Sequence, residues 1–205
     1  WTLGVAVPYH TEIGVAVSDD GGTTWEKASE GPVLGRNHVD PYLTGSPCVL
    51  WDGGVLRCWY HAGTSWETID GRSEPRYRIV YAESDDGMTW RREGTVAIDH
   101  SSADEAGLGR PTVHRDGNRY RMWFACRKGS GYRTDPSRSY RIGYAESTDG
   151  LRWERMDEQA GIDVSAQGWD SEMISYPHRV DHGGTRYLFY NGNGFGRSGF
   201  GYAVQ

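Results

Sequence analysis

The feature that most constrains how this chain can fold is a sequence repeat with a period of about 64 residues. Three runs place a serine, an aspartate and a glycine shortly before a tryptophan, at 18–25, 84–90 and 147–153. Serine and aspartate side chains accept hydrogen bonds from neighbouring backbone amides, and glycine adopts a positive φ without strain. Each run therefore predicts a tight turn, and the repeat predicts several copies of one structural unit.

A second repeat has the same period. Three prolines stand near the start of short apolar segments: Pro47, Pro111 and Pro177. A glycine turn and an aromatic segment follow each of them. A further strand is expected before each serine turn and at the end of the chain, at 13–17, 77–82, 140–145 and 200–204. This succession of hairpin, long loop, strand, turn and strand is typical of a four-stranded antiparallel propeller blade.

We therefore predict an all-β chain that forms a single domain, a partial β-propeller. Its units are a partial blade at 1–39, blades at 40–103 and 104–167, and an incomplete last blade at 168–205. In the first unit, residues 1–5 are a candidate second strand. About 13 or 14 strands are fewer than a closed ring requires. Three explanations stay open: a preceding segment, a second chain that completes the ring, or an open arc.

Composition argues against several kinds of partner. A formal net charge of −6 provides no basic surface for a nucleic acid, and no apolar run reaches the roughly 18 residues of a membrane helix. The three cysteines do not have a metal-ligand spacing, so we predict no metal site and no cofactor. Cys48 and Cys58 flank a turn and form either a disulfide or two buried thiols. The sequence begins with Trp1 rather than Met, and it leaves the cellular location open.

One rim of the predicted propeller carries the longer and less regular connections, at 62–76 and 126–139, which makes it the expected functional face. The segments that lead into the innermost strands on this rim carry four carboxylates, Asp40, Glu105, Asp170 and Glu172. A pair of carboxylates that flanks a glycosidic bond can hydrolyse it, one as acid and one as base or nucleophile. We therefore predict a carbohydrate partner and these four catalytic candidates. For each residue alone, a structural role in a loop is the alternative.

Other residues on this rim are candidates for holding a sugar. Polar side chains that can bond hydroxyl groups are those of Arg110, Arg127, His178, Asn191 and Asn193. Flat apolar faces for a pyranose ring are those of Trp66, Trp169 and Tyr132. Packing between blades is the alternative for Trp169 and Tyr132, and a glycine-rich turn is the alternative for 190–194.

The chain resembles the five-bladed propellers of the arabinanase, levansucrase and invertase superfamily, especially its glycosidase-like bacterial members. The segments that carry the resemblance are 109–113, 140–147, 168–174 and 190–196. The serine turns are similar to Asp-boxes, which connect the third and fourth strands of a blade. The resemblance covers essentially the whole chain. It implies a glycoside hydrolase fold in which most of the second blade and the third, fourth and fifth blades are present and the first is absent.

The sequence departs from that superfamily at its catalytic positions. The resemblance implies a catalytic base on the first blade, outside this sequence, and two further carboxylates one or two residues before an inner-strand proline. Those positions hold Gly45 and Ser46, Gly109 and Arg110, and Ser175 and Tyr176. The leading hypothesis is a glycoside hydrolase or related glycan-processing enzyme. The alternatives are a non-catalytic carbohydrate-binding propeller and a protein-interaction scaffold.

Overall fold

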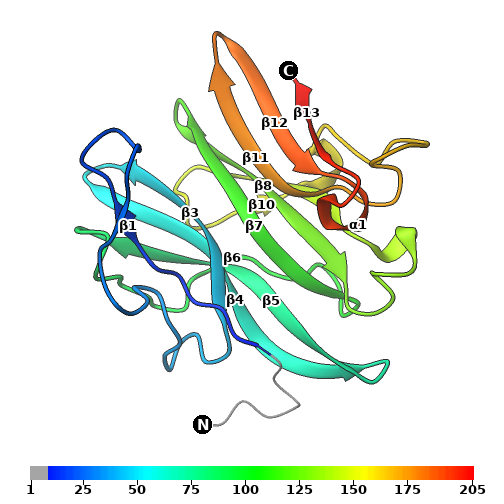
Figure 1. Cartoon of the computed structure of the whole chain (residues 1–205), viewed down its shortest axis with the longest axis horizontal. Helices are drawn as coiled ribbons and strands as arrows, with labels where there is room; N and C mark the ends of the chain where they lie inside the picture. Colours follow the sequence, from blue (N-terminus) through cyan, green and yellow to red (C-terminus); the bar gives the residue numbers. More distant parts are fainter. Residues whose placement is uncertain (1–8) are drawn as a thin grey trace.

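The computed structural model describes residues 9–205, and strands make up most of its regular structure (Figure 1). One four-stranded antiparallel unit consists of β3 (Thr44–Asp52), β4 (Val55–Ile69), β5 (Arg72–Ser84) and β6 (Val96–Ile98). A second consists of β7 (Glu105–Asp116), β8 (Arg119–Lys128), β9 (Arg141–Ser147) and β10 (Glu154–Arg155). A parallel bridge between Tyr77 and Gly107 joins these two units. The prediction of an all-β, propeller-like chain is confirmed.

Shorter units precede and follow these two. They are β1 (Ala16–Val17) with β2 (Glu26–Lys27), and β11 (Ser175–His182) with β12 (Thr185–Asn191) and β13 (Phe200–Val204). Short helical turns occur at η1 (Pro136–Arg138), η2 (Asp157–Gln159) and α1 (Asn193–Gly196). The predicted strand at 1–5 lies outside the described residues. Within 9–205, no helix has the length and apolar character needed to cross a membrane.

The first strands of three units, β3, β7 and β11, lie side by side at the centre of the molecule (Figure 1). A repeated hydrogen bond links them. The backbone N–H of Val113 donates to the Cys48 sulfur, and that of Arg179 donates to the Thr112 hydroxyl, both at 3.2 Å. In each bond the acceptor residue directly follows a repeat proline, and the donor residue stands two positions after the repeat proline of the next unit. Successive units are therefore related by the same step.

The cysteines are free thiols. Across the β3–β4 hairpin Cys48 pairs with Trp59, whereas Cys58 pairs with Val49, so the two cysteines do not face each other. Burial raises the pKa of the Cys48 thiol, which therefore stays protonated at neutral pH. Of the two alternatives for this pair, the structure shows the thiols.

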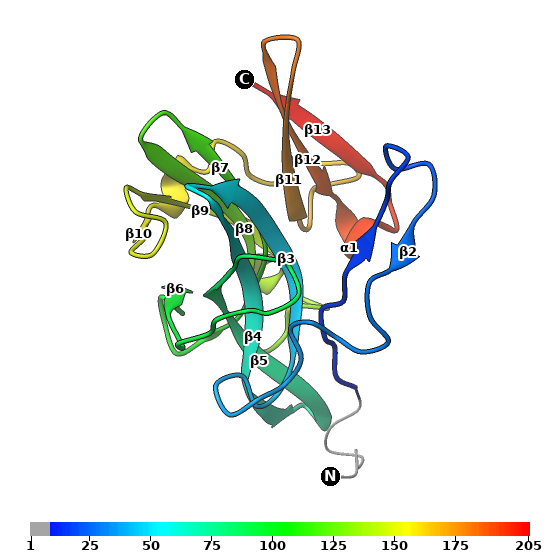
Figure 2. The ribbon, with the colours of Figure 1, turned by 90° about the vertical axis from the view of Figure 1, so that its left-hand side faces the viewer.

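Apolar layers fill the space between successive units. The largest includes Trp59, Ile79, Leu108, Met122 and Phe124, which come from both four-stranded units. Similar layers lie on the two outer sides, around Leu34 and Tyr60 and around Tyr144 and Ile174. The sheet of β3, β4 and β5 is thus covered by apolar side chains on both faces. Figure 2 shows the ribbon of this sheet in side view.

The three serine turns share one set of hydrogen bonds. In each turn the serine hydroxyl accepts a glycine N–H at 2.8 Å, and the aspartate accepts two further backbone amides. The tryptophan indole N–H donates to a glycine carbonyl at 3.0 or 3.1 Å. These amides hold the pKa of Asp86 and Asp149 below the usual value. The turns are structural connections from β1 to β2, β5 to β6 and β9 to β10.

The prediction of a long irregular loop at 62–76 is wrong. The segment 62–76 is the outer part of the β4–β5 hairpin, whose strands pair as far as Ile69 and Arg72 around a two-residue turn at Asp70 and Gly71. Its polar composition suggested a loop. However, its side chains pair across the strands, as in the ion pair between Arg76 and Glu67.

Candidate functional site

Three residues at equivalent positions of the repeat have an unusual backbone. Ser46, Arg110 and Tyr176, each just before a repeat proline, have φ values of 49°, 53° and 57°. For residues other than glycine this left-handed conformation costs about 1–2 kcal/mol each. The pairing register of the innermost strand shifts at each of these sites. The repeated bulge turns all three side chains toward the same place.

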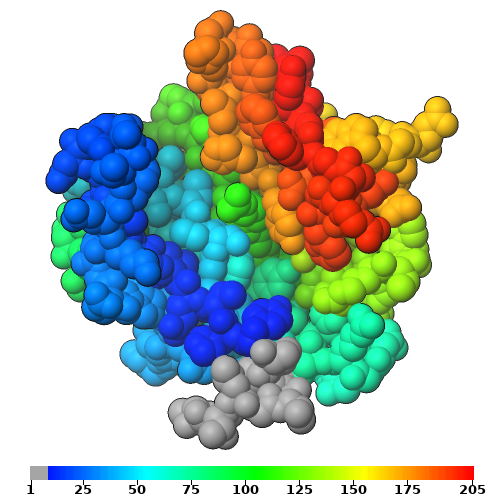
Figure 3. Space-filling model, viewed as in Figure 1, coloured from blue at the N-terminus to red at the C-terminus, as the bar shows by residue number. Residues whose placement is uncertain are grey.

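These three residues line a cavity of about 370 Å³ at the centre of the molecule, the axial cavity. Figure 3 shows a hollow in this region, between the cyan, green and orange segments. Its lining also includes His61, Ala125 and Asn191 from the second strands, Tyr77 from β5, Tyr140 directly before β9, and Gly109. Successive units thus contribute residues from matching positions of the repeat.

Four polar side chains of the axial cavity have no hydrogen-bond partner within 9–205: Ser46, His61, Arg110 and Asn191. His61 lies in a space that two glycines leave open, because a Cβ on Gly45 or Gly109 would come within 2.7 Å or 3.1 Å of its ring nitrogens. Burial lowers the pKa of His61 to about 4, so the imidazole is neutral at neutral pH. A neutral imidazole offers one donor and one acceptor to a ligand.

Tyrosines form one wall of the cavity. The hydroxyls of Tyr77 and Tyr140 are 2.9 Å apart, and the ring of Tyr176 lies 5.8 Å from that of Tyr140. Arg127 lies behind this wall and is 3% exposed. Its Nε donates to the Tyr140 hydroxyl at 3.2 Å, and its guanidinium lies 4.0 Å from the centre of the Tyr132 ring. The wall therefore combines apolar ring faces with a buried cation.

The four predicted carboxylates do not converge on this cavity, which is a correction to the expected geometry. Asp40 and Asp170 are both buried, and each accepts a tyrosine hydroxyl from the second strand of its own unit. Tyr60 donates to Asp40 at 2.7 Å and Tyr190 donates to Asp170 at 2.9 Å. Arg92 adds an ion pair to Asp40 at 3.1 Å. Both carboxylates tie a loop to the sheet that follows it.

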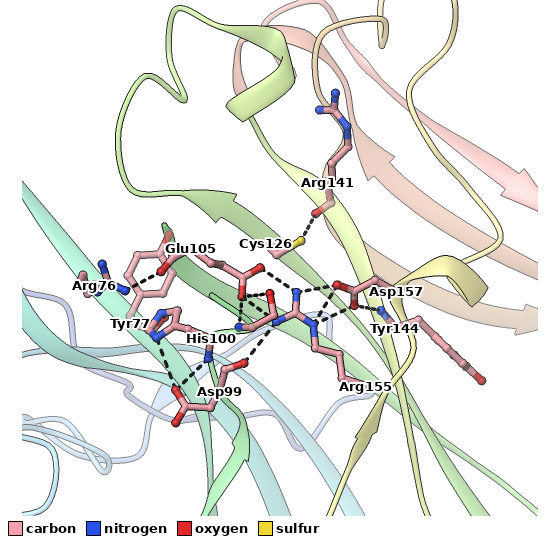
Figure 4. Close-up of polar contacts among 11 residues, drawn as sticks. Arg76, Tyr77, Asp99, His100, Glu105, Cys126, Arg141, Tyr144, Arg155 and Asp157 are labelled. Atoms are coloured by element: carbon pink, nitrogen blue, oxygen red, sulfur yellow. Dashed lines mark hydrogen bonds and ion pairs between the residues drawn. The ribbon is translucent and has the colours of Figure 1, made fainter. Parts of the chain in front are cut away.

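Glu105 is held in a buried ion pair (Figure 4). Arg155 contacts both of its oxygens, at 2.7 and 2.8 Å, and the backbone N–H of Ser101 donates at 2.8 Å. Burial opposes the charge, but Arg155 and Ser101 outweigh it and hold the pKa of Glu105 below its usual value. A carboxylate with a depressed pKa and an occupied set of acceptors is poorly suited to act as a general acid.

Glu172 and Asn193 lie at a second cavity of about 370 Å³, on the rim near α1. Glu172 is exposed, and within 9–205 its carboxylate has no partner. The Asn193 side chain accepts the backbone N–H of Glu172 at 2.8 Å and donates to the Gly168 carbonyl at 3.0 Å, so it braces the loop. Across the described residues, no group of three or more His, Cys, Asp or Glu side chains could hold a metal ion.

The remaining candidates lie away from the axial cavity. Trp66 packs edge-on against Tyr9 at 5.1 Å on the β4–β5 hairpin. Trp169 stacks on Tyr190 at 5.3 Å and lies against Gly192 and Gly201, where a Cβ would clash with its ring. The side chain of His178, on β11, is exposed and does not line the cavity.

Of the predicted binding residues, Arg110 and Asn191 line the axial cavity and Arg127 lies behind its wall. Sequence reasoning did not select Ser46, His61, Tyr77, Tyr140 and Tyr176. The signal that finds them is the repeat itself. Ser46 and Tyr176 directly precede a repeat proline, and His61 stands 14 residues after one, as Asn191 does. Tyr77 and Tyr140 each stand seven residues before the serine of a turn.

No protein-family model matches this chain. It is 43% identical over 204 residues to two proteins of Mycobacterium tuberculosis, MT1551 of strain CDC 1551 / Oshkosh and Rv1502 of strain ATCC 25618 / H37Rv. Each match covers 100% of this chain and 64% of the relative. The chain therefore spans less than two thirds of these relatives.

Solved glycoside hydrolases have the same fold. A thermostable family-43 enzyme matches with a TM-score of 0.71 and 16% identity, over 94% of this chain and 62% of that one. Zg3597, a family-117 enzyme of Zobellia galactanivorans, matches with a TM-score of 0.63 and 20% identity, over 79% and 52%. At this level of identity the likeness establishes the fold alone, a β-propeller-like fold that the chain shares with these enzymes.

Proposed function

We propose that the chain binds a carbohydrate in the axial cavity. The observation that carries this proposal is the convergence of Ser46, His61, Arg110 and Asn191, all without hydrogen-bond partners within 9–205, in one cavity with tyrosine faces. Sugars present hydroxyl groups at their edges and apolar C–H faces. A few convergent polar groups among aromatic rings match this surface.

The fold supports the same class of ligand. Its structural neighbours include glycoside hydrolases of families 43 and 117. Fold alone does not fix function, so the residues of the cavity carry this proposal. The cavity volume of about 370 Å³ lies within the usual range for small-ligand sites.

We further propose that the complete protein is a glycoside hydrolase whose catalytic carboxylates act at this cavity from outside residues 9–205. Within that range the cavity lining contains no carboxylate, and three of the four candidates are engaged in structural contacts. The greater length of the M. tuberculosis relatives allows for such a segment. Glu172, exposed at the rim, is the remaining catalytic candidate in this chain.

A five-bladed ring is part of this proposal. The outer edge of β13 is available for strand pairing, and Phe200, Tyr202 and Val204 on it are 73%, 59% and 61% exposed. A further segment of the protein or a second chain would pair with this edge and cover these side chains. Native mass spectrometry of the 205-residue chain distinguishes the two, because only the second predicts a stable oligomer.

Titration of the ¹⁵N-labelled chain with a panel of neutral and acidic oligosaccharides tests the binding proposal. We expect saturable chemical-shift changes at residues of the axial cavity, and their loss in His61→Ala and Asn191→Ala. His178→Ala is the matched control, because His178 lies outside the cavity. A folded chain that binds no member of the panel, or that binds one equally well in all three variants, would show that the cavity is not a sugar site.

Measuring reducing-sugar release from the same panel tests hydrolysis separately. We expect the chain to bind without hydrolysing, and we expect the longer M. tuberculosis relatives to hydrolyse. If the chain itself hydrolyses a glycan and Glu172→Gln abolishes this, the catalytic group lies on the rim. The proposal that it comes from outside residues 9–205 is then wrong.

A further inference from the structure

The axial cavity is electropositive. Among residues 9–205, Arg110 is the one charged side chain that lines it at neutral pH, because His61 is neutral there. Within the described chain Arg110 has neither an ion pair nor a side-chain hydrogen bond. Most other arginines of the described part are paired with a carboxylate, as Arg155 is with Glu105 and Arg179 with Asp116. The cavity therefore contains a cation without a counterion from the described residues.

A second guanidinium adds to this charge from behind the tyrosine wall. Arg127 is buried, and its hydrogen bonds go to the Tyr140 hydroxyl and to two backbone carbonyls, not to a carboxylate. Glu74 accepts the Tyr132 hydroxyl and pairs with Arg133, not with Arg127. A buried charge without a close opposite partner is costly, and a nearby anion lowers that cost.

The geometry points to a ligand that brings a negative charge. We propose, on the basis of the proposed carbohydrate function, that the axial cavity recognises a uronic acid residue of a glycan. Its carboxylate binds Arg110, and its hydroxyls bond Ser46, His61 and Asn191. A guanidinium presents two parallel N–H donors that match the two oxygens of a carboxylate, which makes such pairs strong and directional. The ring of Tyr176, which is partly exposed and lines the cavity, is available to the pyranose ring.

The left-handed backbone at Arg110 is consistent with this role. Tyr176 and Ser46 share the conformation, so the repeat produces the bulge, and the residue type decides what each bulge presents. The three bulges offer one cation, one phenol ring and one hydroxyl. These are the chemical groups that a carboxylated sugar ring requires.

The test uses ligand pairs in which esterification removes the carboxylate charge and adds only a methyl group: the trisaccharide of galacturonic acid and its methyl ester, and methyl glucuronoside and its methyl ester. Binding to the 205-residue chain is measured by NMR titration. We expect each acid to bind about tenfold or more tightly than its ester, as a charged pair in a sheltered site provides. We expect Arg110→Gln to remove this preference and Arg110→Lys to retain part of it. Arg72→Gln, which changes an exposed arginine outside the cavity, leaves the preference intact.

The outcomes separate this inference from the function on which it rests. Equal binding of acid and ester, with Arg110→Gln without effect on their ratio, overturns the uronic acid assignment and leaves a neutral sugar site. If galactose 6-sulfate binds as tightly as the acids, the uronic acid assignment is also overturned, because the site then binds any anionic sugar and does not select a carboxylate. If the folded chain binds no sugar of either kind, the proposed function itself fails.

Discussion

Replacing Glu105 with glutamine should destabilise the protein strongly. The carboxylate is 6% exposed and Arg155 is 17% exposed, and breaking a buried ion pair costs about 3–5 kcal/mol. Arg155 keeps a second contact with Asp157 at 2.6 Å, and glutamine can still accept one hydrogen bond. We therefore expect a loss at the lower end of this range, about 3 kcal/mol in the free energy of unfolding. For a domain of this size, that loss lowers Tm by about 6–12 °C.

Urea unfolding of the wild type, Glu105→Gln and Asp104→Asn at pH 7 measures this effect. Asp104 forms an exposed ion pair with Arg138, so its variant should change the free energy of unfolding by less than about 1 kcal/mol. The pKa of Glu105 is lowered in the folded state. The stability that ionised Glu105 contributes is therefore fully present above the pKa of a glutamate in the unfolded chain. It disappears as the pH falls through the lower pKa of Glu105 in the folded protein. The difference between variant and wild type should accordingly shrink in acid.

A different result would assign Glu105 another role. If Glu105→Gln is as stable as the wild type at pH 7 but loses the processing of a bound glycan, the carboxylate acts in chemistry. The ion pair with Arg155 is then incidental, and the structural reading of this residue is refuted.

Three further predictions concern the loops and the cavity. Tyr60→Phe and Tyr190→Phe should each lower the free energy of unfolding in urea by about 1–3 kcal/mol. The loss should be larger for Tyr190→Phe, because among residues 9–205 Asp170 has no second partner of the kind that Arg92 gives Asp40. Arg110→Gly should stabilise the protein by about 1 kcal/mol in the same assay, since glycine tolerates a φ of 53°, while it abolishes uronic acid binding. Because the pKa of His61 falls to about 4 on folding, stability should decrease as the pH drops from about 6.5 toward 4, and Tm against pH should be flatter in His61→Gln.

Much of the fold was predictable from the repeat alone. The glycine turns at 53–54, 117–118 and 183–184 lie where the sequence places them, and so does β13. The outer part of the β4–β5 hairpin, 62–76, was not predictable, because its polar residues carry no alternation of apolar and polar positions. Pairing between the strands, not burial of one face, holds its outer part together.

The candidate site was predictable only in part, because the sequence shows where carboxylates stand and not what they contact. Asp40 and Asp170 were selected for their place before an innermost strand. Each has a tyrosine 20 residues later, Tyr60 and Tyr190, that bonds it. In the middle unit the corresponding position is Phe124, which has no hydroxyl to donate. This spacing was visible in the sequence, but pairing across 20 residues requires the fold to interpret it.

The repeat separates structural positions from functional ones. The carboxylate and tyrosine recur in two units, where a loop is tied to a sheet. An acceptor follows Pro47 and Pro111, where two units are joined. The residue just before each proline has the same backbone in every unit but changes from serine to arginine to tyrosine. Fold stability alone would favour glycine at a positive φ in all three places. Three different side chains, each held at a cost and each turned into one cavity, are better explained by a ligand that contacts all of them.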